Sequence, residues 1–431
     1  MSNRTTISFA FDNRIAISNI TTPICDDASE HQAVEGRDSF SLPGFNDLGT
    51  VDDLVVSLDL LGVPGPLILS NNLEERTALG TGAQFGVYED GLLDASNNAS
   101  ETYLESVAVK RGLFVTEDGG SRLDLSSRES RRQIHDMYLE VVALRHKALR
   151  SHRNIVRLLG WSVEETFQNP PLLVVELALG HLRTMFEKSP VKVTSGTIQQ
   201  LSIDIGQGLD AIHEAGIVHC DIKPENILIF ENFATNFHGT VPYVAKLADF
   251  GLSISEVKES MDDGVYVTGM STDWCAPEIR QGIKLSTSQL IKADTFSYGL
   301  VLASMSCYEG QAPKTKDRGA ILEVLKTQAG ISDTFRSLLR TAVSQLLQQD
   351  AAERPMSVGM LLKDESAACV NWFVTQTLPF ATTHTSQGIR RSRKMDRAGR
   401  VRRLVVSISV VATTLSSILP PWTAVVISAL P

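Results

Sequence analysis

Three polar side chains stand close together in the segment from Ile217 to Leu228. Asp221 is followed by Lys223 two residues later and by Asn226 five residues later. A carboxylate can orient and deprotonate an incoming hydroxyl group, a lysine can neutralise charge on a moving phosphoryl group, and an amide oxygen can bind Mg²⁺. The types and spacing of these residues therefore predict phosphoryl transfer.

The polar segment is enclosed by apolar pairs, at residues 217–218 before it and 227–228 after it. Such pairs beside a polar loop are typical of short strands. An amphipathic helical pattern at residues 199–215 comes before the first pair and ends at Gly216, a common helix stop. The sequence thus predicts that a helix and two short strands hold the loop on a packed body.

This loop resembles the catalytic loop of the eukaryotic protein kinases, His-Arg-Asp-x-Lys-x-x-Asn. The resemblance implies that Asp221 and Lys223 are catalytic and that Asn226 is a ligand of Mg²⁺. Lysine at position 223 resembles the serine/threonine class of kinases. One position departs from the pattern, because Cys220 stands where most kinases have arginine.

The departure at Cys220 has a consequence for regulation. In kinases the arginine is a buried cation that a phosphorylated activation segment neutralises, and cysteine removes that charge. We hypothesise that the activity of this chain does not depend on a phosphate docking at residue 220.

A glycine-rich turn from Leu79 to Tyr88 precedes the loop in the chain. Glycine lets backbone N–H groups approach phosphate oxygens because it has no Cβ. A dinucleotide-binding turn is the alternative, but it requires a following helix, whereas a strand-like segment follows here. Similarity to the kinase lid implies nucleotide contacts from Gly80, Thr81, Gly82 and Val87. The third kinase glycine would fall at Phe85, and here the glycine is Gly86, one place later.

An alternating apolar strand, residues 106–110, ends in a single lysine. A lysine at a strand end is usually a surface residue, but the position of Lys110 after the glycine turn favours a functional one. The segment resembles the Val-Ala-Ile-Lys strand of kinases. A helical period follows at residues 134–144, and Glu140 on that helix is the implied partner of Lys110.

Residues 171–177 form an apolar strand that ends near an acid, as in the hinge between the two lobes of a kinase. The resemblance implies that Val175 guards the back of the nucleotide pocket. It also implies that the backbone around Glu176 hydrogen-bonds adenine. The implied adenine site comprises Ala108, Glu176, Ala178 and Leu228.

Further kinase-like motifs follow in the order that kinases have. Asp249 opens an Asp-Phe-Gly segment and is the second implied Mg²⁺ ligand. The segment Trp274-Cys-Ala-Pro-Glu278 resembles the end of an activation segment, with Ser271 in the place of the substrate-shelf threonine. Arg354 is the implied partner of Glu278 in a buried ion pair.

Asp294 opens a helical segment that resembles the kinase helix whose acid braces the backbone of the catalytic loop. Together the motifs imply an α+β, two-lobed protein kinase-like fold. Its N-lobe would be a five-stranded antiparallel sheet with one main helix, its C-lobe would be mostly helical, and ATP would lie between them. The implied reaction is ATP- and Mg²⁺-dependent phosphorylation of serine or threonine in a protein substrate. A catalytically silent scaffold and a small-molecule phosphotransferase are the alternatives.

Composition and charge set the frame for this reading. The chain has 431 residues, 43% hydrophobic and 21% charged, as in folded soluble proteins. Its net charge of −10 argues against a nucleic-acid partner. Five scattered cysteines without a C-x-x-C pair predict reduced thiols in the cytosol. The predicted division is a partly disordered extension (1–72), a kinase-like domain (73–373), a basic linker (374–403) and a candidate transmembrane segment (404–430).

The C-terminal tail carries a basic block followed by an uncharged run. Residues 404–430 contain no charged residue. A membrane helix needs about 20 apolar residues, and basic residues stay on the cytosolic side. The pattern favours a membrane anchor with the kinase-like domain in the cytosol. Pro420-Pro421 and the hydroxyl residues before them (Ser407, Ser409, Thr413, Thr414, Ser416 and Ser417) weaken this prediction, so that peripheral attachment through the basic block and a soluble tail remain alternatives.

Overall fold

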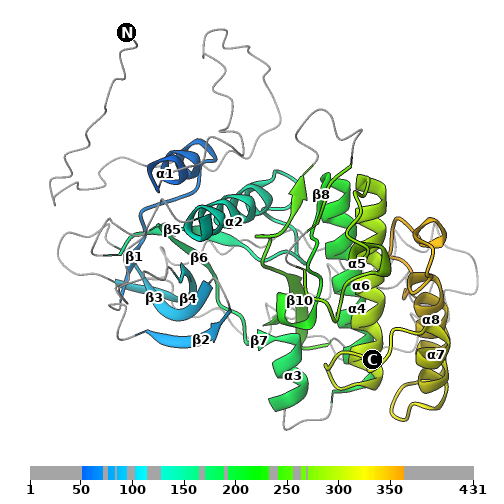
Figure 1. The fold of residues 1–431 in the computed structure, drawn as a ribbon. Coiled ribbons are helices and arrows are strands. Elements are labelled where there is room, and N and C mark those ends of the chain that lie inside the picture. Colours follow the sequence, from blue (N-terminus) through cyan, green and yellow to red (C-terminus); the bar gives the residue numbers. More distant parts are fainter. Residues whose placement is uncertain are drawn as a thin grey trace, which may run out of the picture. The chain divides into compact units, whose positions relative to one another are not determined.

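The computed structural model describes residues 51–70, 76–82, 85–94, 102–113, 128–164, 170–188, 193–232, 241–255, 264–267 and 270–363. All of them lie in one compact unit of the chain (Figure 1). The predicted linker, the predicted membrane segment and residues 1–50 of the predicted extension lie outside the described residues, so these predictions are not tested. Within the described part, no helix is both long enough and apolar enough to cross a membrane.

The N-terminal part of the unit contains a six-stranded antiparallel sheet. Its strands are β1 (Ile68–Leu69), β2 (Thr77–Thr81), β3 (Phe85–Asp94), β4 (Thr102–Gly112), β5 (Leu158–Ser162) and β6 (Leu172–Glu176). The order is β1-β3-β4-β6-β5, and β2 also pairs with β3. The sequence predicts five strands here, and the additional strand, β1, comes from the predicted N-terminal extension.

The sheet is curled, because one short segment contacts two strands that stand apart in the strand order. The N–H group of Leu67 donates to the carbonyl of Trp161 on β5 at 2.8 Å, and β1 directly after it pairs with β3. The apolar side chains inside the curl form a cluster of their own: Val107, Val109, Leu172 and Val174, with Leu67 and Leu69 packed against them. Burial of these side chains supports the sheet from within.

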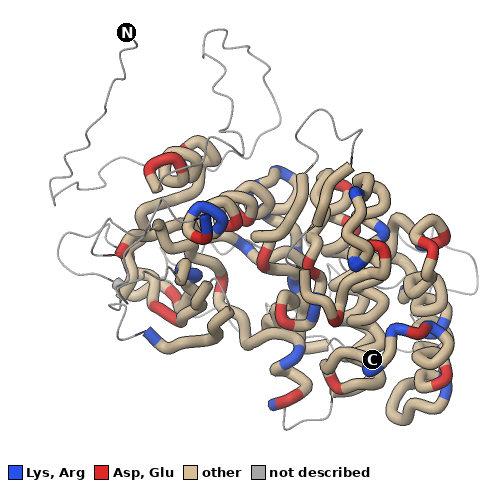
Figure 2. The backbone as a smooth tube through the Cα atoms, viewed as in Figure 1, with Lys and Arg blue, Asp and Glu red and all other residues tan. Residues whose placement is uncertain are grey.

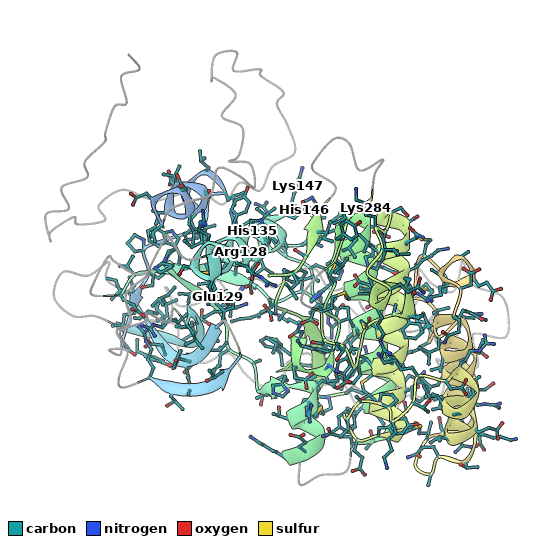
Figure 3. All side chains as sticks on the ribbon, viewed as in Figure 1. Arg128, Glu129, His135, His146, Lys147 and Lys284 are labelled. Atoms are coloured by element: carbon teal, nitrogen blue, oxygen red, sulfur yellow. The ribbon has the colours of Figure 1, made fainter. Side chains whose placement is uncertain are left out.

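Helix α2 (Arg128–Arg145) is the main helix of this part. Ile134, Met137, Val141 and Leu144 are buried on it, at the spacing that places side chains on one helix face. Arg128 and Glu129 are exposed at its first turn and are labelled in Figure 3. The predicted helical period thus corresponds to a helix that places one face, including Glu140, against the body.

The C-terminal part is mostly helical, as the sequence predicts. Its helices are α3 (Leu182–Lys188), α4 (Ser195–Glu214), α5 (Pro277–Arg280), α6 (Thr287–Cys307), α7 (Arg318–Thr327) and α8 (Asp333–Leu346). Helix α6 is buried almost all round, as expected for a central helix. Ser286 is the N-cap residue of this helix, and its hydroxyl and backbone form a capping box with Gln289.

Short strands hold the polar loop in this part. They are β7 (Gly180–His181), β8 (Ile217–Val218), β9 (Ile227–Glu231), β10 (Tyr243–Leu247) and β11 (Ile254–Ser255). Helix α4 is followed by Gly216, whose φ of +73° favours glycine, and β8 begins at the next residue. The two short strands that the sequence predicts on either side of the loop are β8 and β9.

Candidate active site

Helix α6 holds the loop between β8 and β9 in place through hydrogen bonds to the loop backbone. Asp294 on that helix accepts hydrogen bonds from the backbone N–H groups of His219 (2.8 Å) and Cys220 (2.9 Å). Cys220 has a φ of +66°, a conformation that residues other than glycine rarely adopt. The carboxylate of Asp294 therefore holds a strained turn in place directly before Asp221.

Asp221 is buried, and both of its carboxylate oxygens have partners. Oδ2 accepts from Lys223 Nζ at 2.5 Å and from Asn226 Nδ2 at 3.0 Å. Oδ1 accepts from the backbone N–H of Ser271 at 3.2 Å, and Lys223 Nζ also donates to the Ser271 hydroxyl at 2.9 Å. The structure thus brings together the three polar residues of the loop, and it places Ser271 beside them.

A second cluster of charges surrounds Lys110, two residues before the end of β4. Its Nζ donates to Glu140 Oε2 on α2 at 2.5 Å and to Asp249 Oδ1 at 2.7 Å. The Phe85 ring, at the start of β3, lies over the same nitrogen at 4.6 Å from its centroid. Lys110 and Glu140 are buried, whereas the Asp249 side chain is 47% exposed. The predicted lysine–glutamate pair is present, and Asp249 joins it.

These contacts shift the ionisation of the three groups. Burial lowers the pKa of Lys110, but the charges of Asp249 and Glu140 outweigh burial and raise this pKa above its ordinary value. For Asp249, the partial loss of water around the carboxylate would by itself raise the pKa. The charge and the hydrogen bond of Lys110 outweigh this effect and lower the pKa of Asp249. The pKa of Glu140 is raised by burial in spite of Lys110. At neutral pH the cluster holds a protonated lysine beside an ionised Asp249.

Asn226 and Asp249 offer oxygen atoms suited to Mg²⁺. The Asn226 amide nitrogen donates to the backbone carbonyl of Asp221 at 2.8 Å and to its carboxylate. The amide oxygen takes part in neither bond and is the atom type that can bind a metal ion. Mg²⁺ is usually bound by one or two protein oxygens together with phosphate and water. Among the described residues, no group of three or more His, Cys, Asp or Glu side chains could hold a metal. A two-residue site completed by phosphate oxygens fits this donor set.

The residues predicted to contact the nucleotide lie on both parts of the unit. Val87 on β3 is paired with Lys110, and Ala108 on β4 is paired with Val175 on β6. Paired and alternate residues of a sheet point to the same face, so these four side chains share the face that carries Lys110. Leu228 lies on β9 and pairs with His181 and Lys246, outside this sheet.

The lid itself is formed by β2 and β3, where Gly80 pairs with Val87 and Thr81 with Gly86. A Cβ at Gly80 would meet no atom within 4 Å, so the backbone there is open to an approaching group. The N–H of Gly82 donates to the carbonyl of Phe85 at 2.8 Å and closes the turn. The departure from the kinase pattern therefore places an aromatic ring, instead of a glycine, beside Lys110.

Glu176 and Ala178 lie at the end of β6 and just after it. The Glu176 side chain accepts from Lys246 Nζ at 2.6 Å and from the N–H of Arg157 at 2.8 Å, so it is engaged within the protein. Ala178 is partly buried against the main core. A contact of either residue with adenine would have to use the backbone, and this stays a prediction.

The predicted pair of Glu278 and Arg354 is present. Arg354 donates from two nitrogens to the two oxygens of Glu278, at 2.6 and 2.9 Å. The guanidinium also donates to the backbone carbonyls of Gln348 and Gln349. Its side chain is fully buried, so the pair anchors the end of the activation segment to the last helices of the unit.

Cys220 lies in an apolar environment. It is buried in a cluster with Val218, Leu285 and Leu290, against which Ile254 and Val265 also pack. Burial, and then the charges of Asp294 and Asp221, raise the pKa of its thiol well above the ordinary value. The position where most kinases carry a cation is therefore neutral here.

Two contributors to the site were not singled out from the sequence. Phe85 appeared only as the residue in place of a glycine, and its contact with Lys110 depends on side-chain direction, which spacing does not show. His219 is fully buried, and its Nε2 lies 3.1 Å from the Ala248 carbonyl. This contact links the catalytic-loop segment to the Asp-Phe-Gly segment. The histidine of the kinase pattern His-Arg-Asp, which falls at His219, was the sequence signal that could have indicated it.

Comparison with known proteins agrees with this geometry. A family model described as the protein kinase domain matches residues 122–365, more than half of the chain. The chain belongs to the protein kinase domain family. The glycine-rich turn and Lys110 precede the matched residues, and in the structure Lys110 contacts Glu140 and Asp249 inside them. The α+β kinase fold that the sequence predicts is confirmed.

Similar proteins include several serine/threonine-protein kinases. The serine/threonine-protein kinase unc-51 of Caenorhabditis elegans is 28% identical over 222 residues, which are 50% of this chain and 24% of that protein. The G-type lectin S-receptor-like serine/threonine-protein kinase LECRK2 of Oryza sativa subsp. japonica is 28% identical over 255 residues, 57% of this chain and 26% of that protein. The chain thus spans about a quarter of the length of these two relatives.

Proposed function

We propose that this kinase transfers the γ-phosphate of ATP to serine or threonine hydroxyls of protein substrates. The observation that carries the proposal is the joint presence of two charge clusters, Lys110 with Glu140 and Asp249, and Asp221 with Lys223 and Asn226. The family and the named serine/threonine-protein kinases among its relatives support protein phosphorylation. The residues fit the charge distribution that phosphoryl transfer requires.

The proposed chemistry assigns each group one task. Asp221 orients the substrate hydroxyl and accepts its proton, while Lys223, which contacts Asp221 and Ser271, neutralises charge on the transferred group. Lys110, kept protonated by its two carboxylate partners, positions the phosphates of ATP. Asn226 and Asp249 would hold Mg²⁺, which supplies positive charge to the phosphate oxygens. Catalysis then rests on positioning and charge neutralisation.

A scaffold that binds nucleotide or partners without catalysis is the second candidate. The observation in its favour is the Phe85 ring over Lys110, on a lid whose third glycine is displaced. All four residues proposed for the chemistry (Lys110, Asp221, Asn226 and Asp249) are nevertheless present, and each forms a hydrogen bond within one of the two clusters. We therefore retain the active kinase as the proposed function. Small-molecule substrates are disfavoured, since Ser271 and the Glu278 segment resemble a peptide shelf.

The test is phosphate transfer from labelled ATP with Mg²⁺, using the full chain and generic protein substrates. Asp221→Asn and Asp249→Ala variants run alongside. Label on serine or threonine that is lost in both variants supports the proposal. An absence of transfer, while ATP still raises the melting temperature, supports the scaffold. An absence of both effects contradicts both candidates.

A further inference from the structure

Residues 51–70, which we name the N-terminal strap, precede the part of the chain that the family model matches. The strap begins with α1 (Val51–Leu60), a helix that packs on α2. Leu54 and Leu58 on α1 are fully buried and belong to the main core together with residues of α2. Two fully buried leucines make this a packed interface and not a loose surface contact.

The end of α1 is tied to the end of α2. The guanidinium of Arg145, the last residue of α2, donates to the carbonyls of Leu61 at 3.2 Å and Gly62 at 2.8 Å. Gly62 has a φ of +62°, and the N–H of Val63 returns to the carbonyl of Leu58 at 2.9 Å, as in a glycine-terminated helix. Arg145 therefore satisfies carbonyl groups at the end of α1 while it links the two helices.

The middle of the strap is hydrogen-bonded to β5. The N–H of Trp161 donates to Pro64 at 2.9 Å, the N–H of Leu67 donates back to Trp161 at 2.8 Å, and the Ser162 hydroxyl donates to Leu67 at 2.7 Å. A Cβ on Gly160 would lie only 2.4 Å from the Pro64 carbonyl. The close approach of the strap to β5 thus requires glycine at this position.

The last part of the strap reaches β3, the strand that carries Phe85 and Val87. Ile68 and Leu69 pair with Leu93 and Leu92, and the Ser70 hydroxyl bridges the Gly91 N–H (3.1 Å) and Asp90 Oδ1 (3.0 Å). Since β3 pairs with β4 along its length, the strap connects α2 to the strand pair that holds Lys110.

We propose that the N-terminal strap positions α2 so that Glu140 reaches Lys110, and that it is therefore a required part of the catalytic unit. Lys110 lies on β4 and Glu140 lies on α2, and their ion pair at 2.5 Å links the two elements. The strap holds α2 at one end, and both β5 and β3 at the other. Any shift of α2 away from the sheet would separate two buried charges, which is costly. The activity measurement below rests on the proposed function; the exchange measurement does not.

The first test replaces both buried leucines in the full chain, as Leu54→Ala with Leu58→Ala. The matched control is Val56→Ala with Leu60→Ala, since these side chains are on the same helix but 53% and 46% exposed. We expect amide hydrogen exchange within residues 128–145 to become at least tenfold faster in the first variant, with residues 287–307 of α6 unchanged. The control should match the parent in both segments. Unchanged exchange in α2 would overturn the proposal.

A second variant covers the case in which the double alanine variant does not fold. Arg145→Gln removes the tie between α2 and α1 from the helix end, and exposed Arg150→Gln is its control. The proposal predicts faster exchange in α2 for Arg145→Gln alone. Equal exchange in the two glutamine variants would contradict it.

A double-mutant comparison separates positioning from general destabilisation. In the parent, we expect loss of Leu54 and Leu58 to lower kcat at least tenfold. In a Glu140→Gln background, where the ion pair is already broken, the same change should lower kcat less than twofold. Additive losses would mean that the strap acts elsewhere. If the parent itself transfers no phosphate, the proposed function fails, and the exchange data alone decide on the strap.

Discussion

The two charged centres of this protein, around Lys110 and around Asp221, are held in different ways. Lys110 contacts residues that are 30 and 139 positions away, on separate elements. Asp221 contacts Lys223 and Asn226 within its own loop, and Asp294 on the buried helix α6 fixes the backbone just before it. The lysine centre can therefore be lost by moving one helix, whereas the three polar side chains of the aspartate centre come from one short loop, which Asp294 and Ser271 hold in place.

The two helices on the side of the lysine centre, α1 and α2, differ in the charges that they carry. The α1 helix carries Asp52, Asp53 and Asp59 without a basic residue, next to α2 with its arginines (Figure 2). Helix α2, which contacts Lys110 through Glu140, is itself joined to α1 by apolar contacts and by Arg145. The loop of Asp221 is held instead by Asp294 on α6 and by the N–H group of Ser271. We expect regulation to act on the lysine centre and loss of chemistry to result from changes at the aspartate centre.

The largest effect is expected for Asp221→Asn. The variant keeps the shape of the side chain and an oxygen that can accept from Ser271, but its NH₂ group faces the donors Lys223 and Asn226 and cannot accept the proton of the substrate hydroxyl. We expect kcat to fall by about 10²- to 10⁴-fold, while thermal unfolding shows that the protein is still folded. Initial rates and thermal unfolding measure the two quantities. Comparable activity in both proteins would assign the proton acceptor to another group.

The buried pair of Glu278 and Arg354 should dominate stability on the aspartate side. Arg354→Leu leaves Glu278 as an unpaired buried charge, so we expect the free energy of unfolding to drop by about 3–5 kcal/mol. The double variant with Glu278→Leu should be less destabilised than Arg354→Leu alone, since no buried charge is left. Urea unfolding of the parent, of Arg354→Leu, of Glu278→Leu and of the double variant measures this. A double variant as unstable as the sum of the singles would show that the two side chains are not coupled.

Acidification should affect the stability contributions of Glu140 and Asp249, the two carboxylate partners of Lys110, in opposite directions. The pKa of Asp249 is lowered in the folded protein, so its stabilisation is present at neutral pH and is lost as pH falls through the folded pKa. The pKa of Glu140 is raised, so the folded state takes up a proton at this group more readily than the unfolded chain, with the opposite slope.

Urea unfolding between pH 6 and pH 3 measures these slopes. The stability difference between the parent and Asp249→Asn should shrink towards low pH. The difference between the parent and Glu140→Gln should shift in favour of the parent over the same range. Slopes of the same sign for both variants would mean that folding shifts the pKa values of the two acids in the same direction.

Local patterns allowed much of this site to be predicted from the sequence. The loop residues Asp221, Lys223 and Asn226 are near neighbours, and the glycine after α4 and the apolar pairs around the loop already imply how it is held. The Lys110–Glu140 pair required a resemblance, because spacing alone does not bring a strand and a helix together. The sequence predicted the strap only as part of a partly disordered extension (1–72). Its partners, α2, β5 and β3, were not predicted, since its apolar run is short and they are distant in the chain.

A smaller effect is expected at the lid. Phe85→Gly restores the glycine of the kinase pattern and removes the ring from Lys110 Nζ. A cation–π contact is worth about 0.5–2 kcal/mol, so we expect the KM for ATP to fall by about two- to thirtyfold. Phe85→Tyr, which keeps the ring, is the control and should resemble the parent. A higher KM in the glycine variant would mean that the ring supports the nucleotide instead of covering its site.

No effect on activity is expected from removal of the activation-segment hydroxyls other than Ser271. Cys220 is neutral and lies among Val218, Leu285 and Leu290, and β8 pairs with β11 while Val265 bridges to Leu285. Apolar contacts and backbone hydrogen bonds thus hold the described parts of the segment without a phosphate.

The variant for this test carries alanine at Ser253, Ser255, Ser260, Thr268 and Thr272, and it is compared with untreated and with phosphatase-treated parent. Ser271 is left in place because its hydroxyl and N–H contact Lys223 and Asp221. Both phosphate-free proteins are expected to match the rate of the untreated parent, since a neutral residue at position 220 offers a phosphate no charge to neutralise. A loss of activity in both would place a phosphate receptor elsewhere, and the aspartate centre would then need a phosphate in addition to the support of Asp294 and Ser271.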